Sequence, residues 1–72
     1  MQTKSVTPKF PSQLASLRKS RGFSQSELAR RAGFDRSYIS QLESGARKGL
    51  SSRTVLALAQ ALKVTTDELL GV

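Results

Sequence analysis

Residues 24–45, SQSELARRAGFDRSYISQLESG, contain two short helical patterns that meet across Gly33-Phe34-Asp35. Asp35 is the expected N-cap of the second pattern, which ends at Gly45. A turn this short, with Gly at its bend, makes the two helices cross steeply, so the segment predicts a helix-turn-helix. Small or apolar residues occupy the positions at which such helices pack on each other and on a core, namely Leu28, Ala29, Ala32, Phe34, Ile39 and Leu42.

Three further segments carry apolar residues at helical spacing. The first begins near Pro11 or Ser12 and runs to Arg21, and the second begins at Ser51 or Ser52. The third follows Thr65-Thr66-Asp67-Glu68, which has the pattern of a capping box, as does the segment from Ser24 to Glu27. The apolar residues of these three segments are Phe10, Leu14, Leu17, Val55, Leu58, Ala59, Leu62, Leu69 and Leu70. Since no segment alternates with the period of a strand, we predict an all-α, compact five-helix fold.

Size and residue types restrict both the fold and its chemistry. The chain has 72 residues with no Cys and no His, so neither disulfides nor the usual zinc ligands can stabilise it. We therefore expect one domain over residues 10–72 with an apolar core, preceded by a flexible basic N-terminal arm at 1–9. Without His, Cys or carboxylate clusters outside helix caps, we predict no enzyme, no catalytic residue, no metal and no cofactor. The N-terminal residues are no signal peptide, and no run approaches the ~18 apolar residues of a membrane span.

The charge of the chain points to its partner. Twelve Lys and Arg against five Asp and Glu give a net charge of +7. Such an excess favours a polyanion, with nucleic acid first and an anionic membrane surface second; the alternative is a basic protein whose charge only keeps it in solution. The carboxylates Glu27, Asp35, Asp67 and Glu68 fall at expected helix starts, where they stabilise the positive end of the helix dipole. The rest of the surface is therefore expected to be positive.

The second helix of the pair, 35–44, has one polar face and one apolar face. At ~100° per residue, Tyr38, Ile39 and Leu42 lie opposite the polar side chains. Those polar side chains are Arg36, Ser37, Ser40, Gln41 and Ser44. A merely solvated face more often carries Lys and Glu pairs. Short hydrogen-bonding groups with one fork-shaped cation are instead the types that read base edges in DNA.

The chain resembles the Cro and phage-repressor type of helix-turn-helix DNA-binding domains, the Xre family. The resemblance covers residues 10–71 and rests on LxxLRKxRGFSQxELA at 14–29, AG at 32–33, YISQLExG at 38–45 and ALxVxxDELL at 61–70. It implies a five-helix domain whose third helix enters the DNA major groove. Two departures are a loop RKGLS about one residue longer than usual and an end at Val72 without an appended effector, protease or oligomerisation domain.

Individual roles follow from residue type together with this resemblance. For base contacts we expect Arg36 on guanine and Gln41 on adenine, with Ser37 and Ser40 on bases or phosphates. Gln25, at the first turn of its helix, is expected to bind a phosphate. The remaining candidates for phosphate contact are Tyr38, whose alternative is the rim of the core, and Arg47 and Lys48, whose alternative is plain solvation. The resemblance also implies a partly buried structural ion pair between Arg18 and Glu43.

We therefore predict a sequence-specific double-stranded DNA-binding protein, a small transcriptional regulator and more often a repressor than an activator. It would act in the cytoplasm, bacterial or phage-encoded, as a homodimer that is weak in solution and stabilised on a pseudo-palindromic operator. Residues 69–72 and the loop near Leu50 are the candidate dimer surface; the alternative, strongest for Leu69, is that these leucines close the monomer core. Two other functions remain open: an antitoxin-type or adaptor protein using the domain chiefly for protein–protein interaction, and charge-driven membrane or RNA binding.

Overall fold

The described part of the chain folds into five short helices joined by short loops. In the computed structural model, which describes residues 10–47 and 50–71, the elements are α1 (Phe10–Ser20), α2 (Gln25–Ala32), α3 (Arg36–Ser44), α4 (Ser52–Leu62) and α5 (Thr66–Leu70). The described residues contain no strand, and the predicted all-α five-helix fold is confirmed. The expected arm at 1–9 lies outside the described residues.

The first helix is shifted by a residue from the prediction at both ends. It begins at Phe10 because Pro11 is tolerated in a first turn, where its missing N–H is not needed. It ends at Ser20, one residue before the predicted Arg21, whose N–H still donates to the carbonyl oxygens of Leu17 and Arg18.

Three predicted caps turn out differently from one another. The box at the start of α5 is complete, since the Thr65 side chain accepts from the Glu68 N–H while the Glu68 carboxylate accepts from the Thr65 N–H. At α2 only half of the predicted box forms: Ser24 accepts from the Glu27 N–H, but the Glu27 carboxylate turns to two arginines of its own helix. Asp35 holds the N-cap position of α3 with an extended backbone, but its side chain makes no capping hydrogen bond. Its carboxylate therefore acts only through its charge.

The turn between α2 and α3 depends on Gly33. Its φ is 83°, in the left-handed region, and its N–H donates to Ala29 O. Space alone would admit a side chain, because an added Cβ would meet nothing within 4 Å. The backbone conformation nevertheless favours Gly, since other residues pay about 1–2 kcal/mol there. The bend is therefore set by the backbone rather than by close packing.

All five helices contribute to one core. Its buried apolar residues are Phe10, Leu14, Leu28, Ala29, Ile39, Leu42, Leu58, Ala59, Leu62 and Leu69. Each large side chain buried in this way stabilises the fold by about 1.5–3 kcal/mol. Leu69 is 0% exposed, so its assignment to a dimer surface was wrong: it closes the monomer core, and its neighbour Leu70 is only partly buried.

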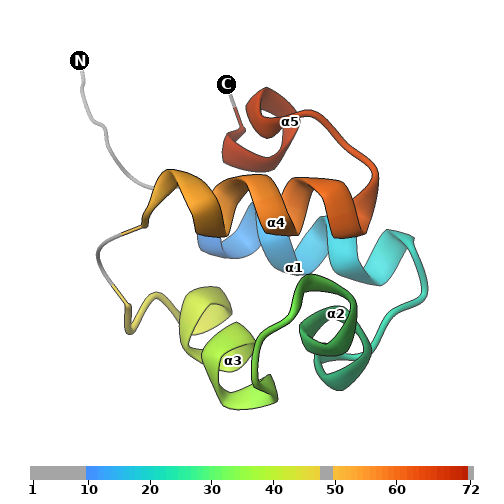
Figure 1. Ribbon diagram of the computed structural model, residues 1–72, viewed down its shortest axis with the longest axis vertical. Coiled ribbons are helices and arrows are strands. Elements are labelled where there is room, and N and C mark those ends of the chain that lie inside the picture. Colours follow the sequence, from blue (N-terminus) through green and yellow to red (C-terminus); the bar gives the residue numbers. More distant parts are fainter. Residues whose placement is uncertain (1–9, 48–49, 72) are drawn as a thin grey trace.

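The packing leaves the helix-turn-helix at one end of the molecule. Figure 1 shows α2 and α3 at the bottom and α5 at the top. α3 packs on α1 and α2, whereas α5 packs on α1 and α4. The outer face of α3 is thus separated from α5 by the middle of the domain. None of the described helices combines the length and the apolar character needed to cross a bilayer.

Candidate nucleic-acid interface

The outward face of α3 carries the polar side chains that the sequence singled out. Arg36, Ser37 and Gln41 are exposed and Ser40 is half-buried, while Ile39 and Leu42 on the opposite face are buried. The core contacts of those two residues fix the helix, so the polar side chains point away from the domain. Their arrangement offers hydrogen-bond donors and acceptors with one guanidinium at the helix start.

Arg18 and Glu43 join α1 to the last turn of α3. Arg18 Nε donates to Glu43 Oε2 over 2.6 Å, and Nη2 donates to Oε1 over 3.1 Å. The same guanidinium donates from Nη1 to Phe23 O over 2.7 Å. With side chains only 11% and 9% exposed, the pair is a structural tie rather than a surface contact. The ion pair implied by the family resemblance is therefore present.

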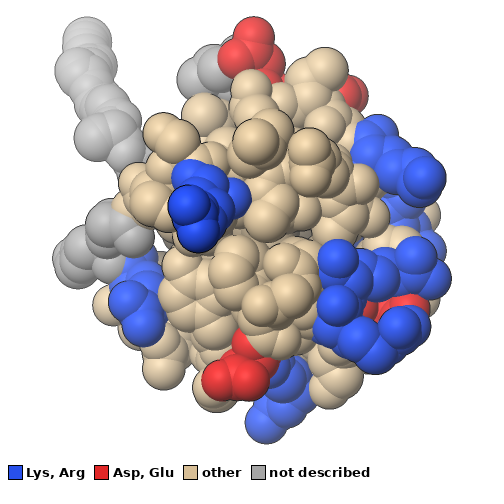
Figure 2. Space-filling view, viewed as in Figure 1, with Lys and Arg blue, Asp and Glu red and all other residues tan. Residues whose placement is uncertain are grey.

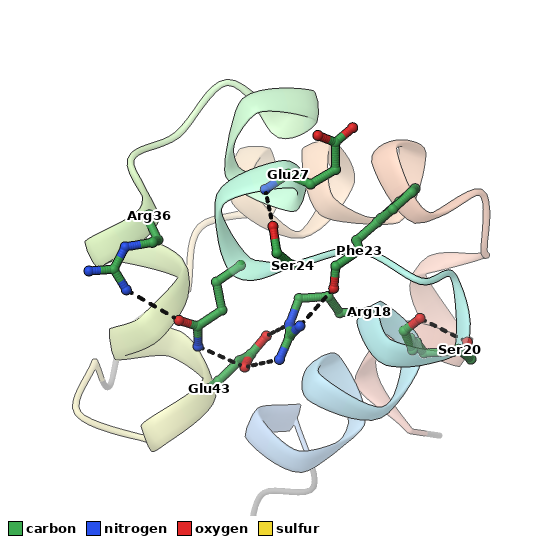
Figure 3. Close-up of polar contacts among 9 residues, drawn as sticks. Arg18, Ser20, Phe23, Ser24, Glu27, Arg36 and Glu43 are labelled. Carbon is green, nitrogen blue, oxygen red and sulfur yellow. Dashed lines mark hydrogen bonds and ion pairs between the residues drawn. The ribbon is translucent and has the colours of Figure 1, made fainter.

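A chain of hydrogen bonds leads from this ion pair to the outer face of α3. Gln25 Nε2, at the start of α2, donates to Glu43 Oε1 over 3.1 Å. Gln25 Oε1 then accepts from Arg36 Nη1 over 3.5 Å, near the upper limit for a hydrogen bond. Figure 3 shows Arg36, Glu43 and Arg18 at successive points along this path. The contact between Gln25 and Glu43 could not be predicted from local sequence patterns, since the two residues are 18 positions apart and on different helices.

Tyr38 lies between the candidate interface and α4. Its hydroxyl is 3.1 Å from Thr54 Oγ1, and its ring makes an edge contact with Phe34, with centroids 4.8 Å apart. The Arg47 guanidinium carbon lies 4.8 Å from the centre of the Tyr38 ring, as in a cation–π contact. Tyr38 therefore supports the position of Arg47, while its hydroxyl oxygen can take part in a further hydrogen bond.

An open hollow lies beside α3. It is lined by Gly33, Phe34, Asp35, Ser37, Tyr38, Gln41 and Arg47. Four of the predicted contact residues thus share one concave surface: Ser37, Tyr38, Gln41 and Arg47. Lys48, the remaining phosphate candidate, lies outside the described residues.

Charge is distributed unevenly over the molecule. Figure 2 shows Lys and Arg gathered mainly on the α2 side of the molecule, and acidic residues both at the α5 end and at the end formed by α2 and α3. Arg30 and Arg31 lie in the last turn of α2, whereas Asp67 and Glu68 lie in the first turn of α5. Hydrogen bonds from Arg30 and then Arg31 hold the pKa of the Glu27 carboxyl below its ordinary value. A polyanion would therefore be attracted mainly toward the α2 side of the molecule. No group of three or more His, Cys, Asp or Glu within residues 10–47 and 50–71 could hold a metal ion.

Comparison with known proteins agrees with this geometry. The model of the Helix-turn-helix family matches residues 14–69, a stretch that includes all of α2, α3 and α4. The chain belongs to this family. This family is the Cro and phage-repressor type that the sequence resembles. The protein is therefore a DNA-binding transcriptional regulator.

Three proteins are similar to this helix-turn-helix regulator in sequence, and for two of them the structure has been solved. The uncharacterized HTH-type transcriptional regulator y4dJ of Sinorhizobium fredii is 43% identical over 58 residues, which cover 81% of this chain and 74% of that protein. The restriction-modification controller protein C.AhdI of Aeromonas hydrophila has 43% identity and a TM-score of 0.80, over 85% of this chain and 91% of C.AhdI. SinR of Bacillus subtilis, a master regulator for biofilm formation solved in complex with DNA, has 31% identity and a TM-score of 0.80, over 85% and 97% of the two chains.

Proposed function

We propose that this helix-turn-helix regulator is a sequence-specific repressor that reads an operator by placing α3 in the major groove of double-stranded DNA. The outward face of α3 carries the proposal, because its exposed side chains are the kinds that discriminate bases while its inner face is locked into the core. SinR, whose fold this chain shares, is a regulator solved in complex with DNA. The regulator acts by occupying DNA rather than by catalysis, in the bacterial cytoplasm where that DNA lies.

Base readout is assigned to the exposed residues of α3. Arg36 donates to guanine O6 and N7, and Gln41 pairs with adenine through its amide. Ser37 and Ser40, with their short hydroxyls, contact bases or the adjoining phosphates. Each well-formed bidentate contact discriminates against the wrong base by about 1–3 kcal/mol.

Phosphate contacts on both sides of α3 fix the position of the domain. Gln25 uses one amide hydrogen on Glu43 and retains the second for a phosphate at the start of α2. On the other side, Arg47 neutralises a phosphate, and the Tyr38 ring holds the Arg47 guanidinium close to the hollow. Lys48, the next residue in the sequence, is assigned a phosphate contact by its charge alone. The Tyr38 hydroxyl adds a phosphate contact beyond its bond to Thr54.

The regulator binds its operator as a homodimer. One α3 reads about four base pairs, which is too few to single out a site in a genome. A two-fold pair doubles the sequence read and sets the half-sites of a pseudo-palindromic operator ~34 Å apart. The dimer contact is a mostly apolar hollow beside α4 and α5, lined by Leu50, Ser51, Ser52, Val55, Leu56, Thr66 and Leu70. Leu56 is the exposed large apolar residue there, 52% exposed, and a patch this small gives a dimer that is weak in solution and forms mainly on DNA.

Selection of bound sites from a random pool of duplexes tests this function. We expect a pseudo-palindromic consensus with two equivalent half-sites. Arg36→Ala should relax the preference at one base pair of each half-site, while a scrambled duplex should bind more weakly and with a steep dependence on salt. Equal affinity for the selected and scrambled duplexes at every salt concentration would exclude sequence-specific readout. Sedimentation with and without the selected duplex measures the stoichiometry, and one chain saturating a non-palindromic site would exclude the dimer.

A further inference from the structure

We propose that Asp35 is a specificity-determining residue whose carboxylate accepts a hydrogen bond from the 4-amino group of a cytosine, next to the guanine read by Arg36. The inference rests on the proposed function, in which α3 lies in the major groove, and deepens it by assigning a further base. It starts from the place of this one carboxylate at the edge of the candidate interface.

The Asp35 side chain is exposed, and the free protein gives it no partner among residues 10–47 and 50–71. It occupies the N-cap position of α3 with φ −84° and ψ 153°, but makes no capping hydrogen bond. At the N-caps of α2, α4 and α5, by contrast, the side chain accepts from the backbone of its helix. No ion pair within those described ranges engages the Asp35 carboxylate either. As far as these residues are concerned, both of its oxygens can still accept from a ligand.

The carboxylate lies on the surface that is proposed to meet DNA. Asp35 lines the hollow beside α3 together with Ser37, Gln41 and Arg47, all of which are exposed. It also directly precedes Arg36 in the sequence. Since recognition helices contact base edges with their N-terminal residues, a side chain at this position lies where bases can be reached.

A negative charge is unfavourable on such a surface unless it faces a donor. The chain carries a net charge of +7, which phosphates attract, whereas a carboxylate repels them. The N-cap position does not by itself call for Asp, because Ser and Asn are preferred there about as strongly. In the major groove, however, cytosine and adenine present amino hydrogens that a carboxylate can accept. Asp35 can therefore favour sites that offer such a group and disfavour other sequences.

Of the two amino bases, cytosine suits a carboxylate better. The adenine amino group lies beside N7, an acceptor that would repel the second carboxylate oxygen. The cytosine amino group has only a carbon-bound hydrogen on that side. An amide such as that of Gln41 matches the donor and the acceptor of adenine, whereas the Asp35 carboxylate offers acceptors only. Arg36 and Asp35 thus read bases of opposite character, guanine with its acceptors and cytosine with its donor.

Binding to the duplex that the unaltered protein selects, and to its single-base-pair variants, provides the test. Asp35→Ser removes the charge and keeps a residue that is favourable at an N-cap. The ratio of affinities between cytosine and the other bases at one base pair should fall by about fivefold or more. The ratios at the base pairs read by Arg36 and Gln41 should stay unchanged. Scrambled duplexes should bind about twofold more tightly at low salt, because a repulsive charge has been removed.

Asp67→Ser is the matched control for charge. It removes the same charge from the first turn of α5, at the opposite end of the molecule from α3 (Figure 1), so it should change no ratio.

A modified duplex tests the contact at the level of one group. The cytosine is replaced by 2-pyrimidinone, which lacks the 4-amino group. The unaltered protein should lose about fivefold or more in affinity, and Asp35→Ser should lose much less. The weaker pairing of the modified base affects both proteins and cancels in the comparison.

The outcomes distinguish this inference from the proposed function. If Asp35→Ser retained every ratio, Asp35 would serve α3 only through the helix dipole and the inference would be overturned. It would also fail if the affected base pair contained no cytosine, or if 2-pyrimidinone weakened both proteins equally. If the unaltered protein bound selected and scrambled duplexes alike, the proposed function itself would fail. Should circular dichroism show that Asp35→Ser is unfolded at the binding temperature, Asp35→Gly takes its place, since Gly is also accepted at N-caps.

Discussion

Glu43→Ala should lower the free energy of unfolding by about 2–4 kcal/mol, because it leaves the Arg18 guanidinium in a nearly buried place without its carboxylate. Arg18 would keep its hydrogen bond to Phe23 O and lose both bonds to Glu43. Gln25 would lose its acceptor as well. The change therefore removes three charge-assisted hydrogen bonds and strands one charge.

The magnitude follows from the burial of the pair. Removing one member of a fully buried ion pair costs about 3–5 kcal/mol. The exposed fractions of 11% for Arg18 and 9% for Glu43 admit some water, which reduces the cost slightly. A domain of this size is stable by about 4–11 kcal/mol in total. The loss should lower the melting temperature by roughly 8–30 °C.

Thermal unfolding followed by circular dichroism measures the effect, with Glu27→Ala as the matched control. Both variants remove one glutamate that accepts from arginine, but Glu27 pairs with arginines that are 71% and 45% exposed. Glu27→Ala should therefore shift melting far less. Equal shifts in the two variants would refute the argument from burial. Replacing both partners, Arg18→Met with Glu43→Leu, should recover much of the stability because no charge is then stranded.

Three further expectations concern readout, assembly and pH. Gln41→Ala should weaken binding to the selected duplex by about 1–3 kcal/mol and relax the base preference at one base pair. Arg47→Ala should instead weaken binding to all duplexes alike and lower the slope of log affinity against log salt concentration by about one. Binding measured on a panel of duplexes distinguishes the two effects. Leu56→Ser should weaken dimerisation on DNA, as sedimentation would show, without lowering the melting temperature of the monomer. If the cooperativity of DNA binding were unchanged, the dimer contact would not include Leu56. The pKa of Glu27 should lie below its ordinary value of 4.5, chiefly through the hydrogen bond from Arg30. Since the folded pKa is the lower one, the contribution of Glu27 to stability should be present above pH 4.5 and disappear as pH falls through the lowered pKa. The pKa can be measured from the pH titration of the Glu27 carboxyl carbon chemical shift. In Arg30→Ala this pKa should move back toward 4.5.

Local patterns in the sequence predicted the helix-turn-helix because the residues that begin and end its helices lie within or next to them. Gly33 and Gly45 end α2 and α3 with φ of 83° at both positions, a conformation that Gly adopts more readily than other residues. The buried positions Ile39 and Leu42 follow the helical period, which needs only neighbouring residues to be read. The fold class and these core positions could therefore be predicted from the residues themselves.

Contacts between distant side chains could not be predicted in this way. In α5, five residues are too few for the period to show that Leu69 rather than Leu70 enters the core. The bond between Tyr38 and Thr54 joins residues that come together only when α4 packs in place. The Glu27 carboxylate could accept a hydrogen bond from the N-cap backbone or from arginines of its own helix, and it pairs with the exposed arginines. Each outcome depends on tertiary arrangement or on competition between partners of similar strength.

The separation of α3 into a buried face and an exposed face has a consequence for how such a regulator acquires new targets. Substitutions at Ser37 or Gln41 touch none of the core, so their effect on stability should stay within about 0.5 kcal/mol. Libraries varied at these positions can therefore be searched for new operators with little loss of folded protein. Arg36 is less exchangeable, because its partner Gln25 is oriented by Glu43. Retargeted variants should keep the base pair read by Arg36 and diverge at the others.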